Sequence, residues 1–143
     1  MKYLILSLLV TMLFFGCTEE NIQQKESSIY GTWQLIEVLS GAPTVDGWNE
    51  IADGYTYKIR GDARFETNIS TECQSGMVSI TDAEITFEYD CEGFTMNKKN
   101  PEGVFKYSYT LGSILELKPI NINCYEGCAY RFKKIEEDKP KAV

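Results

Sequence analysis

The strongest constraint on the fold of this chain is a strict alternation of apolar and polar residues in short segments. The clearest example covers residues 105–111, where Phe, Tyr, Tyr and Leu alternate with Lys, Ser and Thr. This period of two places the apolar side chains on one face of a β-strand. Gly, Asp, Asn and Pro separate the segments. The sequence therefore predicts an all-β domain of about eight short antiparallel strands: Thr32–Leu39, Tyr55–Arg60, Phe65–Ile69, Met77–Ile80, Ile85–Asp90, Phe105–Leu111, Ile114–Leu117 and Ala129–Lys134.

The first residues have a different pattern and are not expected to belong to the domain. Lys2 is followed by an apolar run over residues 3–15, which ends at Gly16-Cys17. The run is too short for a relaxed transmembrane helix and typical of a signal-peptide core. This segment resembles a bacterial lipoprotein precursor, in which the cysteine is lipidated and becomes the new N-terminus. The resemblance implies lipidation of Cys17; the alternative is an ordinary secretory signal followed by an unpaired thiol.

The predicted organisation is a signal peptide at 1–16, a lipidated tether at 17–29, one domain at 30–135 and a disordered tail at 136–143. The tether is rich in Gln, Glu, Lys and Ser, and such residues cannot offset the entropy of ordering. Its Glu19-Glu20 pair is similar to a surface-export signal of some Gram-negative lipoproteins. The expected location is therefore the cell envelope, anchored by lipid to the outer membrane on its periplasmic or surface face.

Composition excludes several classes of function. The chain contains no histidine, so it lacks the imidazole base of Ser-His-Asp and Cys-His sites and the usual zinc ligand. Its net charge of −7 gives no basic footprint for nucleic acid. No catalytic residue, metal ligand or cofactor is predicted, and the protein is expected not to be an enzyme. The expected partners are a membrane, through the anchor, and a small hydrophobic molecule.

Eight short antiparallel strands can form a sandwich or close into a barrel. The domain opens with Gly31-Thr32-Trp33, and Arg131 stands on the last predicted strand. This combination resembles the lipocalin and wider calycin families, in which a Gly-x-Trp on the first strand plugs the closed end and an Arg stacks on the Trp. The resemblance implies an up-and-down, lipocalin-like barrel closed by Gly31, Trp33 and Arg131.

The predicted inward positions are bulky and leave two roles open. They can fill the interior as a packed core, or they can contact a small amphipathic ligand through their hydroxyl groups. The candidate ligand contacts on the strands are Tyr55, Tyr57, Phe87, Tyr89, Tyr107 and Tyr109.

Residues 40–53 form the longest interruption between predicted strands and contain Trp48. Fourteen residues without a strand pattern suggest a compact surface loop. In lipocalins the first connection lies over the open mouth, so Trp48 is a candidate ligand gate. Packing of Trp48 on the barrel rim is the alternative.

Apart from Cys17, four cysteines remain, which favours two disulfides in an exported protein. Their spacing does not suit zinc. Of three possible pairings we favour Cys73–Cys91 with Cys124–Cys128, because each would link neighbouring strands across a turn.

These observations give two functional hypotheses. The first is a membrane-anchored lipocalin-like lipoprotein that binds a small hydrophobic or amphipathic ligand. The second is a cell-envelope interaction or structural module with a solid core, which acts through its loops. An enzyme is a distant third.

Overall fold

The computed structural model describes residues 28–39, 47–94, 103–121 and 128–137. This part of the chain contains nine β-strands and no helix. The strands are β1 (Gly31–Leu39), β2 (Trp48–Glu50), β3 (Thr56–Ile59), β4 (Arg64–Thr67), β5 (Ser75–Ile80), β6 (Glu84–Tyr89), β7 (Val104–Leu111), β8 (Ile114–Pro119) and β9 (Ala129–Glu137).

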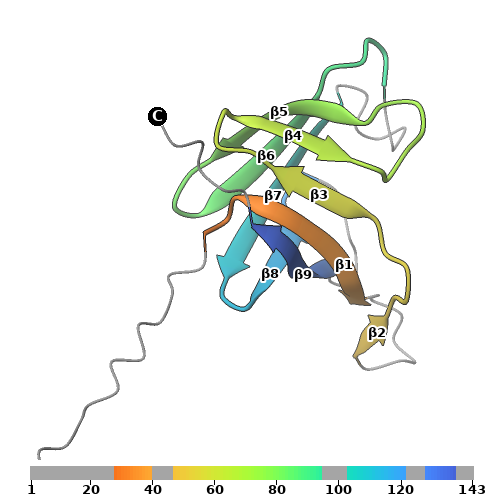
Figure 1. Ribbon diagram of the computed structural model, residues 1–143, viewed down its shortest axis with the longest axis vertical. Helices are drawn as coiled ribbons and strands as arrows, with labels where there is room; N and C mark the ends of the chain where they lie inside the picture. Colours follow the sequence, from red (N-terminus) through yellow and green to blue (C-terminus); the bar gives the residue numbers. More distant parts are fainter. Residues whose placement is uncertain (1–27, 40–46, 95–102, 122–127, 138–143) are drawn as a thin grey trace, which may run out of the picture.

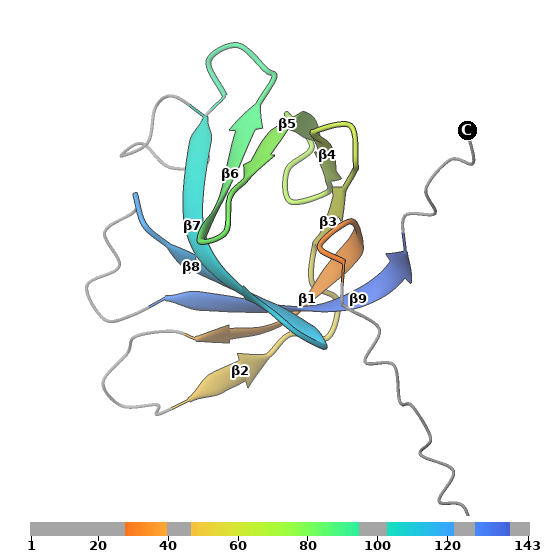
Figure 2. The same cartoon turned by 90° about the vertical axis from the view of Figure 1, so that its left-hand side faces the viewer.

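The strands close into an antiparallel up-and-down barrel (Figures 1 and 2). Each of β3 to β8 pairs with the next strand in chain order, and β1 pairs with both β3 and β9. The β1–β9 ladder runs from Gly31 opposite Glu137 to Leu39 opposite Ala129. This confirms the predicted eight-stranded barrel. The strand that the sequence did not predict, β2, lies outside the ring and pairs with the end of β1.

One edge of β1 pairs with two other strands. Its first half pairs with β3, and its last residues, Glu37 to Leu39, pair with β2. The chain passes from β2 to β3 at Gly54, which lies directly against β1. A Cβ atom at Gly54 would be 2.0 Å from the Leu35 carbonyl oxygen, so only glycine permits this approach.

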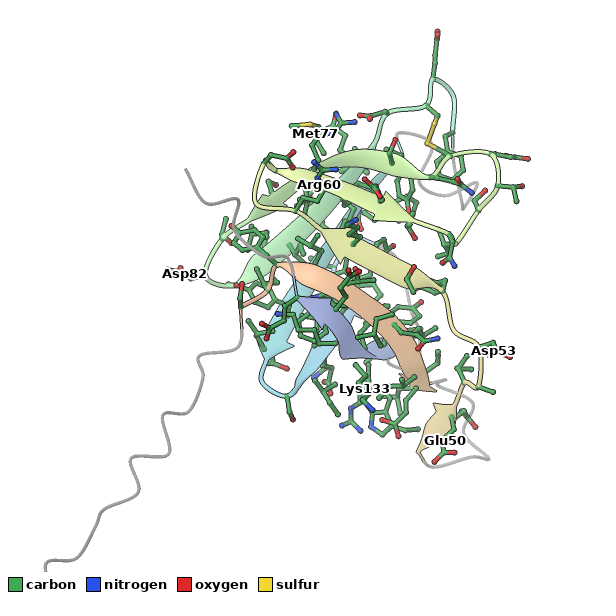
Figure 3. All side chains as sticks on the ribbon, viewed as in Figure 1. Glu50, Asp53, Arg60, Met77, Asp82 and Lys133 are labelled. Carbon is green, nitrogen blue, oxygen red and sulfur yellow. A yellow bond between two sulfur atoms is a disulfide. The ribbon has the colours of Figure 1, made fainter. Side chains whose placement is uncertain are left out.

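The two ends of the barrel differ in their connections. At the turn end, short connections over residues 60–63, 81–83 and 112–113 join β3 to β4, β5 to β6 and β7 to β8. At the loop end lie longer connections, among them residues 51–55 and 68–74, together with the described residues 90–94 that follow β6. Asp82 marks the turn end in Figure 3, and Asp53 lies on the opposite side.

The interior is filled by aromatic and branched side chains from every strand of the ring. Those with almost no exposed surface are Trp33, Tyr57, Ile59, Phe65, Ile85, Phe87, Phe105, Leu115, Leu117 and Phe132. They sit at alternating positions, as the pattern predicted, because successive side chains of a strand point to opposite faces.

The ordered domain is longer than the predicted range of 30–135. Ile29 is buried, and its carbonyl oxygen accepts a 2.8 Å hydrogen bond from the Trp33 indole N–H. At the other end, β9 continues to Glu137, because Glu136 and Glu137 remain in the ladder opposite Thr32 and Gly31. Their charge made them resemble a tail, but both extend the pairing that closes the barrel.

A disulfide joins Cys73 to Cys91, as predicted, with 5.9 Å between their Cα atoms. It links the connection after β4 to the connection after β6 at the loop end. Cys128 is also disulfide-bonded. Its predicted partner Cys124 lies outside the described residues, as does Cys17.

Gly76 provides a direct test of how tightly the interior is packed. A Cβ atom at this position would lie 2.0 Å from the Glu88 carbonyl oxygen and 2.5 Å from the Phe65 ring. Gly76→Ala should therefore destabilise the fold by about 2–3 kcal/mol, as overpacking of a close-packed core does. Urea unfolding measures the change. Gly61→Ala is the matched control, because nothing lies within 4 Å of its Cβ position; equal effects at both sites would contradict the packing.

Candidate functional site in and around the barrel

Tyr57 lies at the centre of the barrel interior, surrounded by other rings. Its ring stacks on Phe87 with centroids 4.4 Å apart and an angle of 11°. Phe65, Tyr55 and Phe132 contact it at centroid distances of 6.0, 5.5 and 5.8 Å. These separations are those of packed aromatic pairs. The centre of the barrel is thus occupied by side chains.

Phenol groups cluster toward the loop end of the interior. The hydroxyls of Tyr57 and Tyr89 lie 3.4 Å apart, and the rings of Tyr107 and Tyr130 are in edge contact. Burial raises the pKa of Tyr55, Tyr57 and Tyr107 above the ordinary value for tyrosine, and the neighbouring phenols raise it further. These tyrosines are therefore neutral at physiological pH.

The structure brings together most of the predicted interior set. Tyr55, Tyr57, Phe87, Tyr89 and Tyr107 belong to one connected group of rings. The Tyr109 hydroxyl is at the opposite end, where it donates to the Thr81 carbonyl oxygen at 2.9 Å.

Several aromatic residues of this interior were missed as site candidates, among them Tyr130, Phe132 and Phe94. Tyr130 and Phe132 alternate with charged residues on β9, so the strand pattern itself could have identified them. Phe94 follows β6 and packs on Tyr89 with centroids 4.8 Å apart. No strand pattern precedes it, so only the fold brings it over the loop end.

Trp33 is fully buried in the barrel, but its cationic neighbour is not the predicted one. The Lys134 ammonium lies 5.3 Å from the centroid of the Trp33 ring and donates to the Ser28 carbonyl oxygen at 2.7 Å. Lys134 is also the register partner of Trp33 across β1 and β9. Lys134 therefore has the position that the family resemblance implied for Arg131.

Arg131 lies on the outer face instead, at the centre of an ionic cluster. Its guanidinium carbon is 3.7 Å from the centroid of the Trp48 ring. Its Nη1 and Nε atoms donate to Glu37 at 3.3 Å and to Glu116 at 3.0 Å. We call Trp48, Glu37, Arg131 and Glu116 the outer cluster; it joins β2, β1, β9 and β8.

The face of the sheet to which each side chain points explains why Arg131 does not reach Trp33. Phe132 points into the barrel, so its neighbour Arg131 points out. On β1 the pairing shifts between Leu35 and Glu37, which is a β-bulge at Ile36. The bulge turns Glu37 to the outer face opposite Arg131. Trp33, which points inward, is separated from Arg131 by the sheet itself.

Trp48 was expected on a loop but belongs to β2. Its position is opposite Leu39 of β1, and its ring lies against Arg131. Residues 40–46 of the predicted loop lie outside the described residues. The described contacts are with the outer wall of the barrel, whereas the two predicted roles were a ligand gate and packing on the barrel rim.

A groove open to solvent lies on the outer face. It has a volume of about 590 Å³ and is lined by polar residues from five strands and the connection after β4. They are Thr32, Thr56, Lys58, Glu66, Thr67, Asn68, Gln74, Ser75 and Glu136. Among the described residues, His, Cys, Asp and Glu form no group that could hold a metal ion. No helix in that part of the chain is long and apolar enough to span a membrane.

Comparison with known proteins supports the architecture only. No protein-family model and no curated protein matches this chain. A crystal structure of an uncharacterized protein from Bacteroides eggerthii DSM 20697 is similar, with a TM-score of 0.50 and 18% sequence identity. The match covers 76% of this chain and 100% of that one. At this identity the likeness shows a shared fold.

The outer cluster predicts a specific energetic coupling. Trp48→Ala and Arg131→Ala should each lower stability, and their effects should be non-additive by about 0.5–1 kcal/mol, because each removes the same cation–π contact. Urea unfolding of the two single variants and the double variant measures the coupling. Arg131→Ala combined with Trp33→Phe is the control and should be additive. Coupling with Trp33 and none with Trp48 would contradict the geometry.

Glu116 should make the outer cluster sensitive to acid. Burial alone raises its pKa, but hydrogen bonds and charge from Arg131 and Lys118 outweigh burial and lower the pKa below its usual value. A carboxylate with a lowered pKa in the folded state contributes stability that is present above the unfolded-state pKa and lost as the pH falls through the folded-state pKa. Glu116→Gln should therefore destabilise the protein at pH 7, and the gap from the wild type should narrow toward pH 3. Urea unfolding at both pH values tests this, and a constant gap would contradict it.

Proposed function

We propose that the protein is a non-enzymatic, lipid-anchored envelope module of lipocalin-like type that binds a partner through the loop end of a solid barrel. The observation that carries this proposal is the mutual contact of the inward aromatic rings around Tyr57. An eight-stranded barrel has room for either its own side chains or one small ligand. Here the rings of β3, β4, β6 and β9 occupy that space.

The position of the first described residues supports the loop end as the binding surface. Ile29 enters the domain beside Trp33, at the turn end. If Cys17 carries the lipid, the tether holds this end within roughly 20 Å of the membrane, by the scaling of a flexible chain. The loop end is then presented away from the lipid.

The loop end also carries the features of a contact surface. Its connections are the longest of the fold, and loops on a rigid scaffold commonly carry binding function. Ile120 and Ile51 are exposed beside these connections, with 49% and 37% of their surface accessible. The Cys73–Cys91 disulfide links two of the connections and so limits their movement.

A second function, binding of a small amphipathic molecule, is favoured by one observation. Tyr55 and Tyr130 are inward-facing residues at the loop end that are only partly buried and pack against the core. They come from β9 and the segment before β3. An apolar ring with a polar tip suits an amphipathic ligand, which would lie above the Tyr57 layer rather than deep in the barrel.

Photo-cross-linking from the loop end tests the proposed partner. A photoreactive residue at position 120 of the full chain should give a discrete protein adduct in the membrane fraction of its source cells. The matched control is position 135 at the turn end, where Ile135 is 53% exposed and no such adduct is expected. Cys17→Ala should remove fatty-acid labelling and release the protein from membranes, which tests the anchor separately.

Two results would overturn the proposal. Equal adducts from positions 120 and 135 would show no preference for the loop end. A stoichiometric small molecule retained in native mass spectrometry, lost in Tyr55→Ala and Tyr130→Ala, would establish the second function instead.

A further inference from the structure

The polar groove on the outer face has a regular construction across five strands. Thr32 of β1 is the register partner of both Glu136 on β9 and Lys58 on β3. Lys58 is opposite Glu66 on β4, which is in turn opposite Ser75 on β5. Register partners share a face of the sheet. These five side chains therefore form one continuous polar row; β1, β3 and β4 lie toward the viewer in Figure 1.

The carboxylates of this row have protein partners close by. Glu66 accepts a hydrogen bond from Arg60 at 3.1 Å. Glu136 accepts one from the Thr32 hydroxyl at 3.3 Å. A carboxylate has acceptor capacity for several hydrogen bonds, so both can accept further bonds from a ligand in the groove.

The donors of the groove lack such partners. Among the described residues, no carboxylate lies within ion-pair distance of the Lys58 ammonium. The side chains of Gln74 and Ser75 likewise make no hydrogen bond with that part of the chain. An ammonium, an amide and a hydroxyl are thus available in a cavity of about 590 Å³.

We propose that this groove binds a neutral saccharide. The lining offers acceptors and donors side by side, as the hydroxyl groups of a sugar require. Glu66 and Glu136 stand on either side of the Lys58 position and disfavour an anionic ligand. The lining contains no aromatic or large aliphatic side chain, which disfavours an apolar one. The site goes beyond the proposed function and does not depend on the lipid anchor or on the loop end.

Calorimetric titration of the full chain, in a detergent without a sugar headgroup, tests the proposal. The neutral probes are maltotriose, xylotriose and mannotriose, and trigalacturonate is the anionic probe. At least one neutral trisaccharide should bind with a Kd of about 1 mM or below, a modest affinity for a shallow hydrogen-bonded site. Trigalacturonate should bind at least tenfold more weakly than that sugar.

Variants at the groove then locate the site. Lys58→Met and Gln74→Ala should each weaken binding about tenfold, because each removes a donor to the ligand. Lys106→Met is the matched control: it removes an exposed lysine of β7 and should leave the Kd unchanged. The proposal is overturned if no neutral trisaccharide binds at about 10 mM, if only trigalacturonate binds, or if the groove variants bind as the wild type does.

Discussion

The pairing of β1 with β9 is the interaction on which the rest of the structure depends. It joins the two ends of the sheet, so no strand of the ring is left as an open edge. Closure with eight strands also fixes the width of the interior, which is just sufficient for side chains or for one small ligand. The large aromatic rings at the inward positions therefore pack against each other, and Tyr57 and Phe87 stack at the centre.

A single bulge in β1 changes which residues of this strand point into the barrel and which point outward. Before Ile36, Trp33 and Leu35 point inward; after it, Glu37 points outward to Arg131. The same edge of β1 changes its neighbour from β3 to β2 near this point, where Gly54 lies against the backbone. The contact between Trp48 and Arg131 also holds the short strand β2 against the barrel wall. Strand pairing over three residues alone would hold β2 there only weakly.

Because side chains fill the interior, the surface offers more room for a binding site than the barrel centre does. A closed eight-stranded ring does not by itself imply a bound small molecule, because function depends on the sites that a fold carries. Here the surfaces with distinct chemistry are the loop end, with its long connections and disulfide, and the polar groove on the wall. The described part of the chain begins at the turn end, beside Trp33, and so leaves the loop end uncovered.

Alternation in the sequence was sufficient to predict the all-β class, the strands of the ring and many of the inward aromatic residues, because a period of two assigns each side chain to a face. Spacing also predicted the Cys73–Cys91 link. In the structure Arg131 points outward and Lys134 lies opposite Trp33, whereas the family resemblance pointed to Arg131 as the partner of Trp33. Only the tertiary structure decided that pairing, the position of β2 and the polar row of the groove. These features depend on strand register and on the two register shifts of the β1–β9 ladder, at Ile36 and at Ile135. Both arise when distant segments meet, and no local pattern encodes them.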